Sequence, residues 1–211
     1  MVYKITDVMR DVRVCLDQNM TSEQLLTTED VNTLALDDIV RSKVLEAVIR
    51  VHSGAPVYLL EAGHNFGDAV YWGDKESGWV LLPEDFMRLI VFEMSDWEQA
   101  VFSAISTTDP EYALQRQRVK ALRGTAQKPV CAITARPEGR VLEFYSCKSK
   151  DAYVRRAQYL PYPKIDAQGG IDICERCYMA VVYATAALVL ITLGEAEKAS
   201  ALFEISKSAM Q

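Results

Sequence analysis

The chain has 211 residues, of which half are hydrophobic and a quarter charged, so it is long enough for one or two domains with a buried core. Its net charge of −6 at pH 7 argues against a generic nucleic-acid-binding protein, which would usually be basic. The charged, amphipathic start predicts no secretory signal, and five cysteines without an evident framework favour a reducing compartment.

Two amphipathic helices are predicted in the first part of the chain. Residues 4–18 and 36–52 each carry apolar side chains at the three- and four-residue spacing of a buried helical face. Pro56 prevents the second helix from continuing. The polar segment 19–33 between them is predicted to be a loop with a short helical turn.

The middle of the chain is predicted to form β-strands, because β-branched and aromatic residues are frequent there and turn residues separate the runs. Two hairpins are expected, with turns at 73–78 and 136–139. Residues 97–105 could continue as strand or short helix, and 111–128 are expected to be irregular or partly helical. The predicted strands are 71–72, 79–83, 89–94, 130–134, 141–145 and 152–160.

A helical hairpin is predicted from Cys174 to Met210, with its joint at Gly194, where a helix end favours a residue that tolerates positive φ. The run Cys177–Leu193 is uncharged over seventeen residues, which reaches the lower limit for a membrane span. Its many small residues, with Thr185 and Thr192 inside it, favour a buried core helix instead.

These elements predict an α+β fold in which N- and C-terminal helix pairs form a helical bundle with an inserted antiparallel β subdomain. The expected division is 1–70 as the N-terminal helical part, 71–165 as the β subdomain, and 166–211 as the hairpin that completes the bundle.

The basic residues between Glu111 and Lys164 are the most suggestive feature for binding. This stretch contains twelve Lys and Arg against four Asp and Glu, a local charge of +8, so the rest of the chain carries −14. One interpretation is contact with nucleic acid or an acidic partner surface, and the other is a solvated loop that balances acidic helices elsewhere. The candidate contact residues are Arg116, Arg118, Lys120, Arg123 and Lys128.

No catalytic, metal-binding or cofactor-binding residue is predicted. Cys174-x-x-Cys177 lacks the second pair or histidines that a zinc site needs, and no clear strand precedes it as in a thioredoxin-like motif, so both are interpreted as packing residues. His52 and His64 have no metal or triad spacing around them, and a solvated or capping role is expected for each.

Four stretches carry a resemblance to a known family: YKITDVMRDVRVCL, GWVLLPEDFMRLIVFEMSDW, KPVCAI with VLEFYS, and YMAVVYATAALVLITLGEAEKASALFEISKSAM. In their arrangement they resemble the head–tail adaptor (connector, or tail-tubular-like) proteins of tailed bacteriophages. The resemblance implies a structural virion protein that forms a homo-oligomeric ring in the neck between portal and tail.

Several further expectations come with this resemblance. The partners would be other copies of the chain, the portal protein and tail or neck proteins, with non-specific contact to packaged DNA and no membrane contact. No catalysis and no cofactor are expected, and the protein would be in the host cytoplasm during assembly.

Two alternatives from other classes remain open. Ala187–Ala209 resembles one unit of a tetratricopeptide repeat, which would indicate a protein-binding scaffold, although such units need neighbouring copies to bury their faces. The second alternative is an enzyme that uses Cys174 or Cys177 as a reactive thiol.

Overall fold

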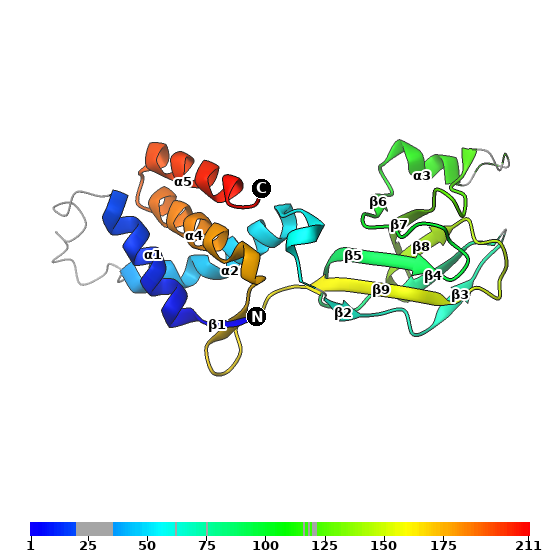
Figure 1. Ribbon diagram of the computed structural model, residues 1–211, viewed down its shortest axis with the longest axis horizontal. Coiled ribbons are helices and arrows are strands. Elements are labelled where there is room, and N and C mark those ends of the chain that lie inside the picture. The colour runs from blue at the N-terminus through cyan, green and yellow to red at the C-terminus, as the bar shows by residue number, and fades with distance from the viewer. Residues whose placement is uncertain (20–35, 62, 75, 116, 118, 120–121) are drawn as a thin grey trace. The chain divides into compact units, whose positions relative to one another are not determined.

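The chain forms two compact units in the computed structural model, which describes residues 1–19, 36–61, 63–74, 76–115, 117, 119 and 122–211 (Figure 1). Met1–Glu61 and Pro163–Gln211 together make the first unit, and Ala62–Tyr162 makes the second. We call them the discontinuous unit and the β-rich unit.

The predicted fold class, a helical bundle with an inserted antiparallel β subdomain, is wrong. Over the described residues the fold is mixed α/β, with five helices and ten strands in three sheets. One sheet lies inside the discontinuous unit, where β1 (Val2–Lys4) pairs with β10 (Gly170–Asp172), and one strand pair of the β-rich unit is parallel.

The physical reason for this error is the length and pairing of the missed strands. Strands β1 and β10 have three residues each, and β2 and β6 have two, which is too short to show an alternating pattern. Their pairing is also non-local: Val2 lies opposite Asp172 across the β1–β10 ladder.

Helix α4 (Tyr178–Thr192) is the central element of the discontinuous unit. Ten of its fifteen residues are buried, and it packs against α1 (Ile5–Asn19), α2 (Leu36–Gly54) and α5 (Ala196–Ser208) (Figure 1). The predicted joint between α4 and α5 is confirmed, because Gly194 has φ +87° and the N–H of Glu195 donates to the Leu190 carbonyl at 2.9 Å.

Two side-chain hydrogen bonds fix α4 against its neighbours. The Tyr178 hydroxyl donates to Asp11 Oδ2 of α1 at 2.6 Å, and Ser206 Oγ of α5 donates to the Ala180 carbonyl at 2.8 Å. By length and composition Glu175–Thr192 is the one span among the described residues that could cross a membrane, and 61% of it is buried within the protein.

The β-rich unit contains the other two sheets. A three-stranded sheet has the order β2 (His64–Asn65), β9 (Val154–Pro161), β5 (Phe86–Met94). A five-stranded sheet has the order β3 (Val70–Trp72), β4 (Gly78–Leu81), β8 (Gly139–Tyr145), β7 (Val130–Arg136), β6 (Ile105–Ser106). The remaining elements are α3 (Pro110–Gln115) and, in the discontinuous unit, the 3-10 helices Val57–Leu59 and Glu175–Cys177.

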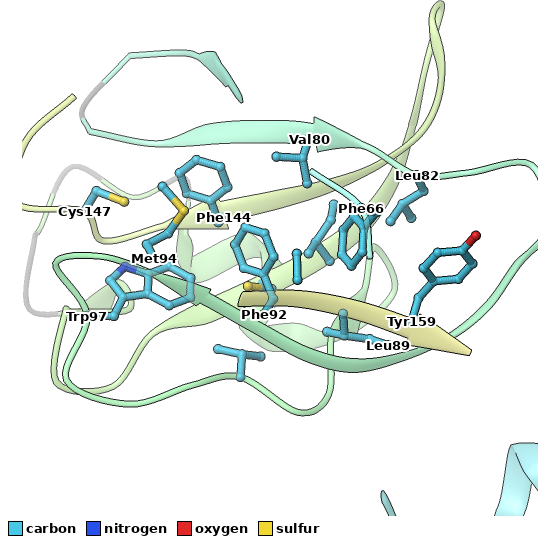
Figure 2. Packing of buried hydrophobic residues seen from close by; sticks show 14 of the residues in the cluster. Phe66, Val80, Leu82, Leu89, Phe92, Met94, Trp97, Phe144, Cys147 and Tyr159 are labelled. Atoms are coloured by element: carbon cyan, nitrogen blue, oxygen red, sulfur yellow. The ribbon is translucent and has the colours of Figure 1, made fainter. Parts of the chain in front are cut away.

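One aromatic-rich core is shared by these two sheets. Phe92 of β5 and Phe144 of β8 approach to 5.7 Å between ring centroids, and Trp97 packs edge-on against Phe92 (Figure 2). Residues 97–105, expected to be strand or helix, are largely irregular before β6, and Val101 bridges back to Phe92.

His52 lies in the last turn of α2 and is buried, which corrects the solvated or capping role expected for it. Only 2% of the residue is exposed, and its Nε2 accepts a hydrogen bond from the Cys174 N–H at 3.2 Å. Burial lowers the pKa of His52 to about 4, because the charged imidazolium would lose its hydration.

We expect His52 to make stability depend on pH in a defined window. Above the ordinary pKa of 6.5 the imidazole is neutral in both the folded and the unfolded protein. Between pH 6.5 and about 4 only the unfolded protein binds the proton, so the free energy of unfolding decreases as the pH is lowered through this range. The contribution lost is about 3 kcal/mol of unfolding free energy. Denaturant unfolding at pH 7 and pH 4 should show a smaller loss of unfolding free energy in His52→Gln than in the wild type. The glutamine amide can still accept the Cys174 N–H. The matched control is His64→Gln at an exposed site, and equal losses in the two variants would contradict the account.

Candidate functional site

The structure describes only two of the five basic residues predicted as a contact surface. Arg116, Arg118 and Lys120 lie outside the described residues. Arg123 is half-buried and lines a cavity of the β-rich unit, whereas Lys128 is exposed and its backbone N–H donates to Thr125 Oγ1 at 3.1 Å. A single basic surface made by all five residues therefore stays a prediction.

The cavity beside Arg123 has a volume of about 650 Å³, within the range usual for ligand sites. Its walls come from the β3–β4 turn, the segment 123–127, and the end of β8 with the residues that follow. Its charged and aromatic lining residues are Asp74, Glu76, Trp79, Arg123, Arg136, Glu143, Tyr145 and Lys148.

Glu143 is the buried charge in the cavity wall. Its strand neighbours Leu142 and Phe144 belong to the aromatic-rich core, so side-chain alternation places Glu143 on the opposite face of β8, where it lines the cavity with only 8% of the residue exposed. Arg136 donates to Glu143 Oε1 from Nε at 3.1 Å and from Nη2 at 2.7 Å. The Tyr145 hydroxyl donates to Oε2 at 2.6 Å.

These partners keep Glu143 ionised at neutral pH. Desolvation acts to raise the pKa of this carboxyl, but the hydrogen bonds from Tyr145 and Arg136 and the charge of Arg136 outweigh it. The pKa of Glu143 is therefore lower than its ordinary value. A carboxylate with this pKa is suited to holding neighbouring groups in place and poorly suited to donating a proton near neutral pH.

Arg136 also connects Glu143 to an aromatic pair on the same sheet. Trp79 lies opposite Glu143 in the β4–β8 register, and its ring stacks on Tyr71 with centroids 4.2 Å apart. The Arg136 guanidinium carbon is 5.2 Å from the centroid of the Trp79 ring, within cation–π distance. The guanidinium is thus held both by a carboxylate and by an indole.

Gln115 fixes another part of the cavity wall. Its Nε2 donates to the Glu111 carbonyl at 3.1 Å, and its Oε1 accepts the Gly124 N–H at 2.8 Å. The buried amide therefore joins the end of α3 to the segment that carries Arg123.

Sequence reasoning missed the pair Glu143–Arg136, although one signal was present. In the run VLEFYS a single carboxylate interrupts an apolar strand. A charge that is buried in such a strand needs a partner, because an unpaired buried charge is costly. What the sequence could not show is that the partner is Arg136, which lies across the β7–β8 hairpin.

The cysteines lack the properties of catalytic thiols. All five are buried, and none of them forms a disulfide. Burial raises the pKa of Cys177 to about 11 and also raises the pKa of Cys174, so both remain protonated at neutral pH, whereas a reactive thiol needs a lowered pKa. Within the described ranges, His, Cys, Asp and Glu side chains form no group of three or more that could hold a metal ion.

Comparison of the chain with protein-family models and with curated proteins found no match. The interpretation of the site therefore depends on its own geometry.

We expect Glu143→Gln to lower the free energy of unfolding by about 1–3 kcal/mol, because it removes the charge from the hydrogen bonds with Arg136 and Tyr145. The loss should be largest at neutral pH. It should shrink as the pH falls through the lowered pKa of the folded carboxyl, since the wild-type side chain then also becomes neutral. Urea unfolding measures the change, with Glu138→Gln at an exposed position of the β7–β8 turn as the matched control. Equal stability of the two variants would show that the Glu143 network contributes nothing.

Proposed function

We propose that this protein is a structural virion protein of a tailed bacteriophage, a subunit of a ring in the head–tail connector between portal and tail, with no catalytic role. The observation that carries the proposal is the connectivity of the two units. The chain begins in one unit, forms the whole β-rich unit Ala62–Tyr162, and then returns to complete the first unit. This order agrees with the order of stretches on which the resemblance to head–tail adaptors depends.

Two separate units suit a subunit that contacts neighbours on different surfaces. The β-rich unit has its own core, made of residues between Phe66 and Tyr159, and so can present a surface independently of the helices. Closed rings form when one surface of a subunit binds a different surface of the next and the rotation closes. A chain with two distinct units offers such a pair of surfaces.

The charge distribution supports contacts between unlike surfaces. The discontinuous unit contains sixteen Asp and Glu against ten Lys and Arg, a net of −6, whereas the β-rich unit contains thirteen of each. In the β-rich unit the positive charge is concentrated in the second half of the segment, from Glu111 onwards. We propose that this basic part faces an acidic portal, tail or neighbouring subunit surface, or the packaged DNA.

The scaffold alternative has less geometric support. A repeat scaffold binds its partners on the concave surface of several stacked units. Here α4 and α5 form one hairpin, and α4 is also covered by α1 and α2, which are not repeats of that hairpin. The buried, high-pKa thiols described above argue against the thiol-enzyme alternative.

We expect the full-length chain to form closed rings, or to add a ring-shaped layer to a phage portal protein if the gene for one lies nearby. Light scattering would give the mass and negative-stain electron microscopy the shape.

Joint replacement of Arg116, Arg118, Lys120 and Arg123 by Glu should abolish stacking on the portal or retention of DNA in particles. Replacement of Lys198 and Lys207 by Glu on exposed parts of α5 is the control. A chain that stays monomeric with and without the portal would contradict the proposal, and unchanged assembly of infectious particles by the fourfold variant would contradict the role of the basic residues.

A further inference from the structure

We propose that copies of the chain join through their β-rich units, with the exposed Phe102 of one copy docked in a slot between β3 and β9 of the next copy. This inference rests on the proposed ring, and it assigns the two unlike surfaces that such a ring needs. It follows from the open edge of β3, from the slot beside that edge, and from the exposure of Phe102 at the other end of the same sheet.

Strand β3 has an open edge. It is an end strand of the five-stranded sheet and pairs with β4 alone among the described strands. The Gly73 N–H donates to the Ser77 carbonyl at 2.8 Å, and hydrogen-bonded pairs alternate along an antiparallel ladder, so Tyr71 also faces β4. The N–H and C=O groups of Val70 and Trp72 therefore point away from β4, where they can pair with a strand of another chain.

A slot of about 480 Å³ lies beside this edge. Its lining residues belong to the segment 65–70, which leads into β3, and to the segment 153–158 around the start of β9. Strand β2 pairs with β9 at Tyr159 and Gln158, whereas β5 pairs with β9 as far as Val154. Among the described strands, the first residues of β9 thus have a neighbour on the β5 side alone, and the slot lies between the edges of the two sheets.

The slot leads to apolar side chains of the aromatic-rich core. Val70 and Val154 line it, pack against that core and are only partly buried. Phe66, which belongs to the core, also lines the slot. An apolar side chain placed here would remove the exposed parts of these residues from water, which is favourable in proportion to the apolar area covered.

Phe102 supplies such a side chain on another surface of the unit. It lies between Val101, which bridges to Phe92 of β5, and strand β6, and 53% of the residue is exposed. Strands β3 and β6 are the two ends of the five-stranded sheet and lie on different sides of the unit (Figure 1). Phe102 and the slot are therefore kept apart within one copy, and they can meet only between copies.

One docked copy would use both features of the β3 side. Its Phe102 ring would enter the slot, while the backbone of residues 102–104, which belongs to no strand, would pair with the outer edge of β3. Addition of an extended segment to a sheet edge, with a pocket for one of its side chains, is a recurring mode of recognition. Because the two surfaces differ, the contact repeats from copy to copy and closes into a ring when the rotation allows it.

The variant Phe102→Ser tests this contact in the full-length protein by light scattering and negative-stain electron microscopy. It should raise the protein concentration needed for ring assembly roughly tenfold or more, because a central aromatic anchor is lost. The melting temperature of the unassembled chain should stay unchanged, since the side chain is exposed. Ile205→Ser, at a 45% exposed apolar position of α5, is the matched control and should assemble as wild type does. Rings formed equally well by Phe102→Ser would overturn this inference and leave the proposed ring intact, whereas a wild-type chain that forms no ring would contradict both.

A cross-linking experiment tests the position of the contact directly. Ser103→Cys and Asp68→Cys place one exposed thiol beside Phe102 and one in the slot wall, while the five native cysteines are buried. Oxidation of the assembled double variant with copper–phenanthroline should give a ladder of covalent oligomers on a non-reducing gel. Either single variant should give dimers at most, because a ladder needs both thiols. Rings of the double variant that yield no ladder would show that Phe102 does not dock in the slot.

Discussion

The discontinuous unit depends on covering one apolar helix on every side. Helix α4 has fifteen residues without a charge, and ten of them are buried. Burial of each Val or Leu side chain contributes roughly 1.5–3 kcal/mol, so leaving one side of α4 open to water would be costly. Helices α1 and α2 come from the start of the chain and α5 from its end, so this core cannot form until both ends of the chain are present.

This constraint explains the connectivity of the whole molecule. The chain must return to the discontinuous unit at Pro163 to bring α4 to its partner helices. The intervening segment Ala62–Tyr162 can therefore form a unit with its own core. In that unit one face of the five-stranded sheet supplies Val80, Leu142 and Phe144 to the core. The pair Glu143–Arg136, which the core does not include, contributes to the cavity instead.

The sequence predicted the features that depend on local patterns. The positions of α1, α2, α4 and α5 followed from the helical spacing of apolar residues. The joint between α4 and α5 followed from the conformational freedom of Gly194. The longer strands β5, β7, β8 and β9 were also predicted within a few residues, because their β-branched and aromatic runs are long enough to recognise.

Features that depend on non-local contacts could not be predicted. The β1–β10 ladder joins residues about 170 positions apart, and its strands are too short to show a pattern. His52 resembles a helix-end residue in the sequence, but the return of the chain at Cys174 buries it. The partner of Glu143 and the strained backbone at Ser146 likewise exist only after the β-rich unit has folded.

The central claim is that α4 is stabilised by helices from both ends of the chain, and hydrogen exchange of the full-length protein tests it most directly. The amides of α4 should exchange slowest in the discontinuous unit, at a rate set by cooperative opening in which buried amides of α1 and α2 take part. A destabilising change in α1, such as Val12→Ala, should then speed exchange in α4 by the same factor as in α2, since Val12 is fully buried. Exchange in α4 that is fast, or that does not respond to this change in α1, would contradict the account.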